Sequence, residues 1–138
     1  MYVKKLRVLI CENHERMRDC ITSVLRTEFD VIGAVGDGYE LVDTAMSFRP
    51  DVVVTDVSTT GLSAVDAQKR LKAEGIDIPF VFVTIDPILK SYWSRDVGPC
   101  IIKTELSCLN AEVQSTADRS VAPMGNGQLQ ADRTFCEG

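Results

Sequence analysis

The sequence predicts an α/β protein with a doubly wound, five-stranded parallel sheet covered by helices on both faces. Short apolar runs alternate with segments in which apolar residues recur at helical spacing. In addition, a polar or charged residue closes four of these runs, at Glu12, Asp56, Thr84 and Lys103. Parallel strands joined by right-handed crossovers bring their carboxyl ends to one edge, where such folds bind ligands. We therefore expect these four side chains to lie near one another.

Three strands and two helices are expected in the first part of the chain. Residues 6–11 read as a strand, and the helix after it, reaching about Phe29, has an apolar face of Met17, Cys20, Ile21, Val24 and Leu25. Residues 31–35 form a second short strand, followed by the turn Gly36-Asp37-Gly38. The second helix carries Leu41, Val42, Ala45 and Met46, and it stops before Pro50 because proline disfavours helix in the preceding residue. Residues 52–55 form the third strand.

The second part of the chain continues the alternation. Ser63 can cap a helix that reaches Gly75, and residues 80–83 form the fourth strand. Asp86-Pro87 is typical of an N-cap and first helical position, and it predicts a short fourth helix with an apolar face of Ile88, Leu89, Tyr92 and Trp93. Residues 100–102 form the fifth strand, and a last helix carries Leu106, Leu109 and Val113.

The apolar pattern fails after about Ser115, and the remaining residues are mostly small or polar. We expect a folded domain at residues 1–118 and a flexible tail at residues 119–138.

Composition narrows the function classes. The net charge is -5 and the chain has no Lys/Arg-rich run, which argues against direct nucleic-acid binding. No apolar stretch approaches the roughly 18 residues of a membrane span, so no membrane association and a cytoplasmic location are expected. The five cysteines include no Cys-x-x-Cys pair and are expected to be reduced structural thiols.

The four strand-end residues suggest phosphate chemistry when they are taken together. Carboxylates, a hydroxyl and an ammonium on one rim are the parts needed to hold and neutralise a phosphoryl group. Each has an ordinary interpretation when it is taken alone. Asp56 could cap a turn, Thr84 could be a β-branched strand residue, and Lys103 could be a solvated strand end. Their shared position at sister strand ends favours a common site.

These motifs resemble the receiver domain of two-component response regulators. The resemblance covers about residues 6–113 and rests on residues 7–14, 49–56, 83–84 and 101–103, which follow the family's order. It implies a flavodoxin-like fold. His14, after the acidic pair, resembles the subgroup whose members often carry a helix-turn-helix output domain.

The resemblance also implies a role for each matching residue. Asp56 matches the phosphoryl acceptor, and Glu12 matches the first acid of the pair that binds Mg²⁺. The backbone carbonyl of Ser58 matches a further Mg²⁺ ligand. Thr84 matches the hydroxyl that reorients toward the phosphoryl group, and Lys103 matches the cation that contacts its oxygens.

Three departures from the family pattern concern signalling. Asn13 stands where the family has a second acid, so Glu12, Asp56 and Lys103 carry one net negative charge. Its amide oxygen is still a permissible hard ligand, although the less negative site should bind Mg²⁺ more weakly. Cys100 stands at the position of the switch aromatic. The segment from Thr84 to Lys103 is shorter than in the family and leaves room for only a short fourth helix.

The resemblance implies a stand-alone receiver domain that a sensor histidine kinase or phosphotransfer protein phosphorylates on Asp56. The chain would then be a signalling phosphoacceptor and not an enzyme, with at most self-catalysed phosphoryl transfer and dephosphorylation. A downstream protein partner would bind the fourth helix and fifth strand. The alternative is a pseudo-receiver, which binds a partner without phosphorylation. A haloacid-dehalogenase-type phosphatase is disfavoured because Ser58 stands where its second aspartate is needed. A flavodoxin-like FMN protein is disfavoured because residues 11–16 do not resemble its phosphate loop.

Overall fold

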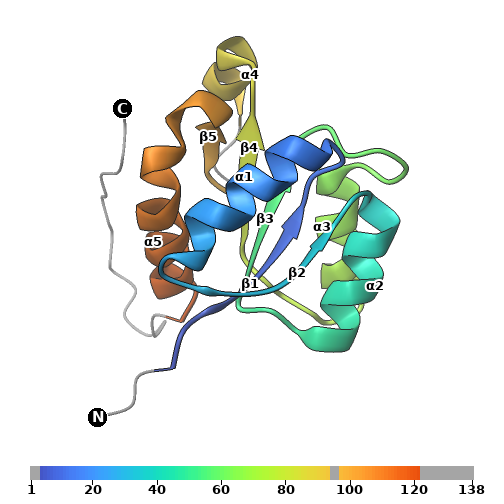
Figure 1. Cartoon of the computed structure of the whole chain (residues 1–138). Coiled ribbons are helices and arrows are strands. Elements are labelled where there is room, and N and C mark those ends of the chain that lie inside the picture. The colour runs from blue at the N-terminus through green and yellow to red at the C-terminus, as the bar shows by residue number, and fades with distance from the viewer. Residues whose placement is uncertain (1–3, 94–96, 122–138) are drawn as a thin grey trace, which may run out of the picture.

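A computed structural model describes residues 4–93 and 97–121. Five parallel strands form one sheet in the order β2-β1-β3-β4-β5 (Figure 1), with bounds β1 Arg7–Cys11, β2 Asp30–Val35, β3 Val52–Asp56, β4 Phe80–Thr84 and β5 Cys100–Ile102. The helices are α1 Glu15–Arg26, α2 Gly38–Phe48, α3 Ala64–Ala73, α4 Pro87–Tyr92, the 3₁₀ helix η1 Lys103–Cys108, and α5 Leu109–Val121. The predicted doubly wound α/β fold is confirmed.

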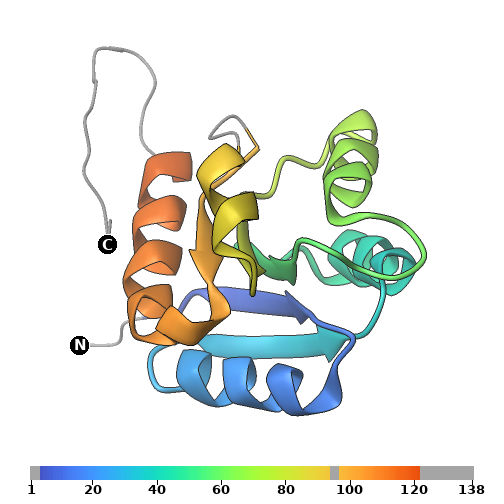
Figure 2. The ribbon, with the colours of Figure 1, turned by 90° about the horizontal axis from the view of Figure 1, so that it is seen from above.

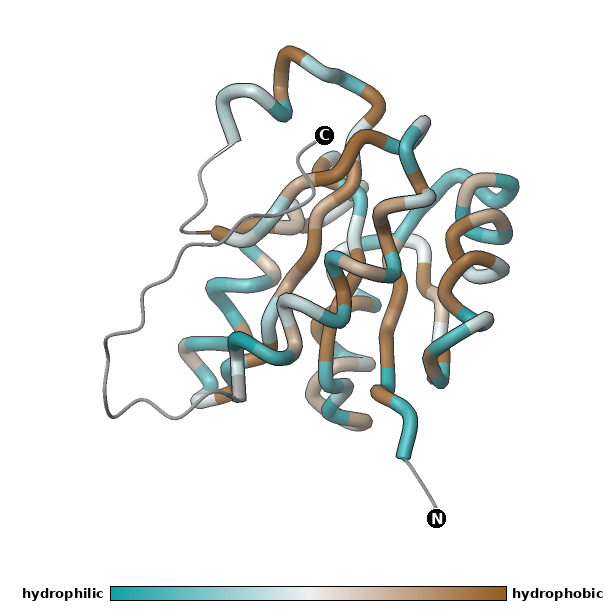
Figure 3. The backbone as a smooth tube through the Cα atoms, turned by 90° about the vertical axis from the view of Figure 1, so that its left-hand side faces the viewer, coloured by the Kyte–Doolittle hydropathy of each residue, from teal (hydrophilic) through white to brown (hydrophobic). Residues whose placement is uncertain are grey.

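Two helical layers enclose the sheet, with α1 and α5 on one face and α2 and α3 on the other (Figure 2). Alternate residues of β1 enter the two cores: Leu9 packs with α2 and α3, whereas Ile10 packs with α1 and α5. Strands β3 and β4 are buried along their whole length, as expected for central strands of a parallel sheet. Figure 3 shows these strands as hydrophobic segments in the interior. This rigid sheet fixes the positions of the residues at its carboxyl edge.

Side-chain caps begin four of the helices, and three of the caps use a carboxylate or hydroxyl oxygen. Asp37 Oδ1 accepts a hydrogen bond from Glu40 N at 2.9 Å at the start of α2. Ser63 Oγ accepts from Asp66 N at 3.1 Å, and Asp86 Oδ1 accepts from Ile88 N at 2.9 Å. Each bond satisfies an amide that has no partner inside the helix. The predicted caps at Ser63 and Asp86 are confirmed.

Helix α4 is short as predicted, and the apolar face expected on it is largely exposed. Ile88 and Tyr92 are 68% and 81% exposed, and the helix has no buried residue. Leu89 is half-buried, and the C-cap residue Trp93 packs against the core. The Trp93 ring lies 5.0 Å from the ring of Phe82 on β4.

Cys20 also departs from its predicted position. It was expected on the apolar face of α1, but it is exposed. The buried residues of this helix are Ile21 and Leu25, so the face that meets the sheet is narrower than the sequence pattern suggested and Cys20 lies outside it.

The last helix is longer than the sequence pattern indicated. It continues past Ser115 to Val121, and Thr116 and Ala117 are each 6% exposed. Thr116 Oγ1 donates a hydrogen bond to Glu112 Oε2 at 3.3 Å, so its hydroxyl is satisfied inside the fold. Small and polar buried residues give a weak hydrophobic period, which explains the difference. Residues 122–138, most of the predicted tail, lie outside the described residues.

Candidate functional site

Two acidic side chains meet at the carboxyl edge of the sheet because their strands are neighbours. Glu12 directly follows β1, and its backbone amide donates to Val35 O of β2 at 2.9 Å, which ties the strand end down. Asp56 is the last residue of β3, which pairs with β1. Both are largely buried, with side chains 1% and 13% exposed. Two carboxylates in this setting need a nearby cation or several hydrogen-bond donors.

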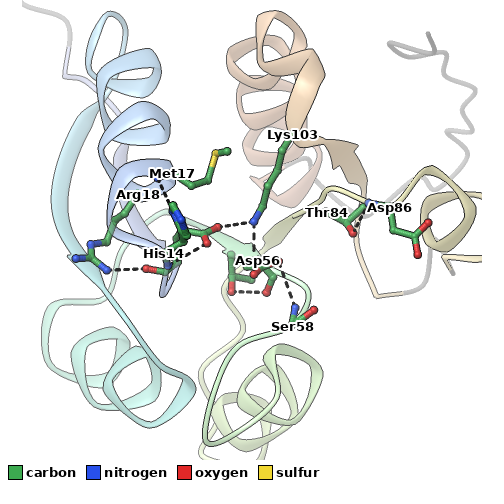
Figure 4. Close-up of polar contacts among 10 residues, drawn as sticks. His14, Met17, Arg18, Asp56, Ser58, Thr84, Asp86 and Lys103 are labelled. Atoms are coloured by element: carbon green, nitrogen blue, oxygen red, sulfur yellow. Dashed lines mark hydrogen bonds and ion pairs between the residues drawn. The ribbon is translucent and has the colours of Figure 1, made fainter.

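Lys103 supplies that cation from the end of the edge strand β5. It is the first residue of η1, immediately after β5, and its side chain is only 8% exposed. Its Nζ lies 2.8 Å from Glu12 Oε1 and 3.5 Å from Asp56 Oδ2, as Figure 4 shows. The structure therefore brings together three of the four strand-end residues through direct ionic contacts.

Thr84 and Ser58 lie on the same rim with contacts of a different kind. Thr84 is 4% exposed, and its hydroxyl oxygen accepts a hydrogen bond from Asp86 N at 3.1 Å. The partner of Thr84 is thus Asp86, the N-cap of α4, and not Asp56. Ser58 N donates to Asp56 Oδ1 at 3.3 Å, so the loop after β3 folds back onto the carboxylate. In Figure 4 the contact of Ser58 leads to Asp56, whereas that of Thr84 leads to Asp86.

Asn13 is exposed and does not cap α1. The N-cap is His14, whose Nδ1 accepts a hydrogen bond from Met17 N at 3.3 Å. The His14 backbone amide in turn donates to Glu12 Oε2 at 3.3 Å. Asn13 therefore lies between a buried carboxylate and a helix cap, with its side chain free of the capping role.

Arg18 is a supporting residue that the sequence did not indicate. Its Nη1 donates to the backbone carbonyl of Glu12 at 2.8 Å, from one turn into α1 (Figure 4). This bond fixes the peptide that precedes Asn13. Arginines are common on exposed helix positions, so no sequence signal separated Arg18 from Arg16 or Arg26.

The electrostatic setting makes Asp56 an unusual carboxyl group. Burial raises the pKa of Asp56 above its ordinary value, the charge of Lys103 opposes that rise, and the neighbouring Glu12 carboxylate adds to it. Asp56 therefore holds a proton more tightly than an exposed aspartate does. A cation brought to the rim would favour its ionised form.

Cys11 and Cys100, which lie in β1 and β5, are not candidates for thiolate chemistry. Burial is the main cause that raises the pKa of Cys11 to about 12 and that of Cys100 to about 11. Neutral thiols are poor nucleophiles and poor metal ligands. The reactive groups of the rim are therefore its carboxylates and its ammonium.

The oxygen atoms of the rim fit a hard divalent cation, but the donor set is small. Glu12 and Asp56 offer carboxylate oxygens, and Asn13 and the Ser58 carbonyl could add neutral oxygens, all of the type that Mg²⁺ prefers. Among the described residues, no group of three or more His, Cys, Asp or Glu side chains lies close enough to hold a metal. The resemblance places a second acid at position 13, where this chain has Asn13.

Comparison with protein families gives a match to the response regulator receiver domain over residues 8–91. The match ends before β5, so Lys103 is placed beside the carboxylates by the structure and not by this alignment. A nitrate/nitrite response regulator protein homolog of Haemophilus influenzae is 35% identical over 83 residues, which cover 59% of this chain and 40% of that protein. The response regulator GacA of Pseudomonas viridiflava is 33% identical over 82 residues, covering 58% and 38%. This chain thus spans about two-fifths of these relatives.

Solved structures share the fold at low sequence identity. The response regulator domain of CheB from Thermotoga maritima superposes with a TM-score of 0.73 at 18% identity, covering 87% of this chain and 100% of that chain. The signal receiver domain of a modulated diguanylate cyclase from Desulfovibrio desulfuricans G20 gives a TM-score of 0.71 at 24% identity, covering 84% and 96%. In the described residues no helix is long and apolar enough to cross a membrane.

Proposed function

The chain belongs to the response regulator receiver domain family, and we propose that Asp56 is the residue on which it accepts a phosphoryl group in two-component signalling. One observation carries the proposal: Lys103 Nζ lies between Asp56 and Glu12, at 3.5 and 2.8 Å, on the edge where three strands end. A strand-end carboxylate with an ammonium beside it provides a nucleophile and a group that can neutralise the incoming phosphate.

The proposed reaction is a transfer from a phosphorylated histidine. An Asp56 carboxylate oxygen forms a bond to phosphorus while the bond between phosphorus and the imidazole nitrogen breaks, and the ring nitrogen keeps the electron pair. Lys103 then faces the transferred oxygens. Thr84 contributes once its hydroxyl leaves Asp86 N and turns toward the phosphoryl group. These steps give a role to three of the four strand-end residues, and the fourth is Glu12.

Glu12 belongs to the proposed Mg²⁺ site. Glu12, Asp56, the side chain of Asn13 and the backbone carbonyl of Ser58 would hold the ion. When bound, it would supply positive charge shared by the carboxylate and the phosphoryl oxygens. With only two carboxylates among these ligands, weak binding is expected.

Partners follow from the same proposal. The donor would be a sensor histidine kinase or a phosphotransfer protein, and the location would be the cytoplasm. A downstream protein would bind α4 and β5, which is supported by the exposure of Ile85, Ile88 and Tyr92 at 72%, 68% and 81%. The net charge of -5 supports signalling through a protein and not through direct nucleic-acid binding.

Incubation with a small phosphodonor and Mg²⁺, followed by intact-mass measurement, tests the proposal. We expect a single labile phosphoryl adduct on the wild-type chain and none on Asp56→Asn. An adduct that survives in Asp56→Asn would reject the assignment of the acceptor.

A second candidate function is supported by the small donor set. Because no third carboxylate lies at the rim of the described residues, the domain could act as a pseudo-receiver that binds its partner without phosphorylation. Absence of any adduct with every donor, in a protein that is folded by circular dichroism, would favour this function.

A further inference from the structure

Strand β2 is an edge of the sheet, and its outer side is open. Among the described residues it pairs with β1 alone, and none of its six residues is buried, in contrast to β3 and β4. Edge strands present backbone N–H and C=O groups that can pair with another chain. The outer side of β2 is therefore a place where a further strand can add to the sheet.

The backbone groups of Ala34 point outward from this edge. Val35 O accepts a hydrogen bond from Glu12 N, so Val35 faces β1. Consecutive residues of a strand direct their backbone groups to opposite sides, and the exposed Ala34 therefore turns its N–H and C=O away from β1. The next outward amide, Gly36 N, already has a partner outside the sheet, because it donates to Glu40 Oε1 at 2.9 Å. Ala34 is thus the residue with which an added strand can pair.

This edge lies in a groove of about 480 Å³. The groove is lined by Arg18 of α1, by Ala34 and Gly36 at the end of the strand, and by Glu40, Asp43 and Thr44 of α2. Because α1 and α2 cover opposite faces of the sheet (Figure 2), both can border one groove only around its free edge. A second copy of this domain would bring the same two helices beside its own β2, and the helices would meet before the strands could pair. The groove therefore fits a single extended segment.

The two walls of the groove carry opposite charges that are not paired with each other. Among the described residues the ion pairs lie elsewhere, and none joins Arg18 to an acid of α2. The Arg18 guanidinium is held in place by its 2.8 Å hydrogen bond to the Glu12 carbonyl. A β-carbon at Gly36 would lie 3.7 Å from Arg18 Nη1 and 3.9 Å from Glu40 Oε1, so both charges border the same strand end. The wall formed by α2 is thus negative, and the wall formed by α1 is positive.

We propose that the outer edge of β2 binds an extended segment of a partner protein in which basic and acidic side chains alternate. The segment pairs with the Ala34 backbone and adds a strand to the sheet. Because consecutive side chains of a strand point to opposite faces, its basic residues face Glu40 and Asp43, and an acidic residue between them faces Arg18. This surface lies at the opposite edge of the sheet from β5, and the inference goes beyond the proposed function because it does not depend on phosphoryl transfer.

A blocked peptide with this pattern, Ac-Val-Lys-Glu-Lys-Val-NH₂, tests the proposal in an NMR titration of the isotope-labelled full chain at constant ionic strength. Saturable shifts are expected at Ala34 and along the groove, whereas the charge-reversed peptide Ac-Val-Glu-Lys-Glu-Val-NH₂ should bind much more weakly. Absence of saturable shifts, or equal binding of the two peptides, would overturn the inference.

Substitutions on the α2 wall test the charge complementarity. The double variant Glu40→Gln with Asp43→Asn should bind the peptide roughly fivefold more weakly, which is the scale of two exposed ion pairs, and its glutamine keeps an oxygen for Gly36 N. Asp66→Asn with Asp77→Asn is the matched control: it removes two charges from exposed positions outside the groove and should leave the affinity nearly unchanged. Equal weakening by the two double variants would mean that only the net charge attracts the peptide, which would contradict the proposal.

A proline substitution separates strand pairing from charge attraction. Ala34→Pro removes the N–H that the added strand needs, at an edge position where the sheet's own ladder does not use it. The variant should keep the circular-dichroism spectrum of the wild type and lose binding of the peptide. Undiminished binding by a folded Ala34→Pro would mean that the peptide does not pair with this edge, and the inference would be rejected.

Hydrogen exchange on the wild-type chain covers the case in which Ala34→Pro does not fold. In the free chain the Ala34 amide should exchange faster than the Val35 amide, because only Val35 faces the ladder with β1, and saturating peptide should slow exchange at Ala34. An Ala34 amide whose exchange the peptide does not change would contradict the proposal. A concentration-dependent dimer in ultracentrifugation, with the Ala34 amide protected in the absence of peptide, would show that a second copy covers the edge and would also reject it.

Discussion

Replacing Gly38 with alanine should loosen the loop that follows Asp56. Gly38 begins α2, and a β-carbon built there would lie 1.9 Å from the backbone oxygen of Leu62. Real contacts of this kind essentially never fall below 3.0 Å, so the two backbones would have to separate by about 1.1 Å in a packed region. Where these two backbone segments meet, Gly38 N also donates a hydrogen bond to Thr60 O at 3.1 Å. Separation of the segments would weaken this bond.

The cost can be estimated from measured cases of overpacking. Such insertions destabilise proteins by about 1–3 kcal/mol. For a domain of this size, that corresponds to a fall in melting temperature of roughly 4–12 °C. Because the displaced loop also carries Ser58, Gly38→Ala should weaken Mg²⁺ binding as well. Thermal melts by circular dichroism, with and without MgCl₂, measure both effects.

Alanine substitutions at two other glycines distinguish the effect of steric crowding from that of backbone strain. At Gly36 the nearest atoms to a β-carbon are 3.7 and 3.9 Å away, so Gly36→Ala should melt at the wild-type temperature or slightly above it. At Gly75 nothing lies within 4 Å, but φ is +80°, so Gly75→Ala should cost only about 1 kcal/mol, from the left-handed backbone. If Gly38→Ala melts at the same temperature as Gly36→Ala, the result would contradict the close packing of the loop against α2.

Three further predictions concern the site and the end of the chain. Burial raises the pKa of Asp56, so Asp56→Asn should increase the free energy of unfolding at pH 7 in urea titrations. This gain in stability should shrink as pH falls through the raised pKa, and it should disappear below about 3.9, the pKa of an aspartate in the unfolded chain. A loss of stability at pH 7 would contradict this prediction. Asn13→Asp should tighten Mg²⁺ binding in calorimetry and slightly destabilise the metal-free protein, because the new charge repels Glu12 and Asp56; an equal or weaker affinity would mean that position 13 does not face the metal. A chain that ends at Val121 should melt within a few degrees of the full chain, whereas one that ends at Ser115 loses buried Thr116 and Ala117 and should melt much lower; equal melting of the two would show that this turn of α5 is dispensable.

Much of the fold and the core of the site could be predicted because a polar or charged residue follows the apolar run of each strand concerned. Asp56 and Glu12 each follow an uninterrupted apolar run, and in a parallel sheet this suffices to place them on one edge. Lys103 follows the same logic, and the structure confirms that it reaches both carboxylates. The meeting of these charged side chains at one edge was therefore predictable from residue type and position.

The remaining features depend on distances that a sequence pattern does not contain. Trp93 and Tyr92 are adjacent and both aromatic, yet only Trp93 packs on Phe82, because α4 is too short to bury both. Thr116 and Ala117 are buried without contributing a strong hydrophobic signal. The preference of Lys103 for Glu12 over Asp56 arises from side-chain reach across the sheet, and no spacing in the chain encodes it.

The central claim, that Asp56 accepts the phosphoryl group, is tested most directly by chemical mapping of the modified residue. After treatment with a small phosphodonor and Mg²⁺, borohydride reduces an aspartyl phosphate to homoserine, and peptide mass spectrometry locates the change. We expect homoserine at position 56 and at no other aspartate, including Asp51 and Asp86. Homoserine at a different position, or none under conditions that give an adduct by intact mass, would contradict the assignment of Asp56.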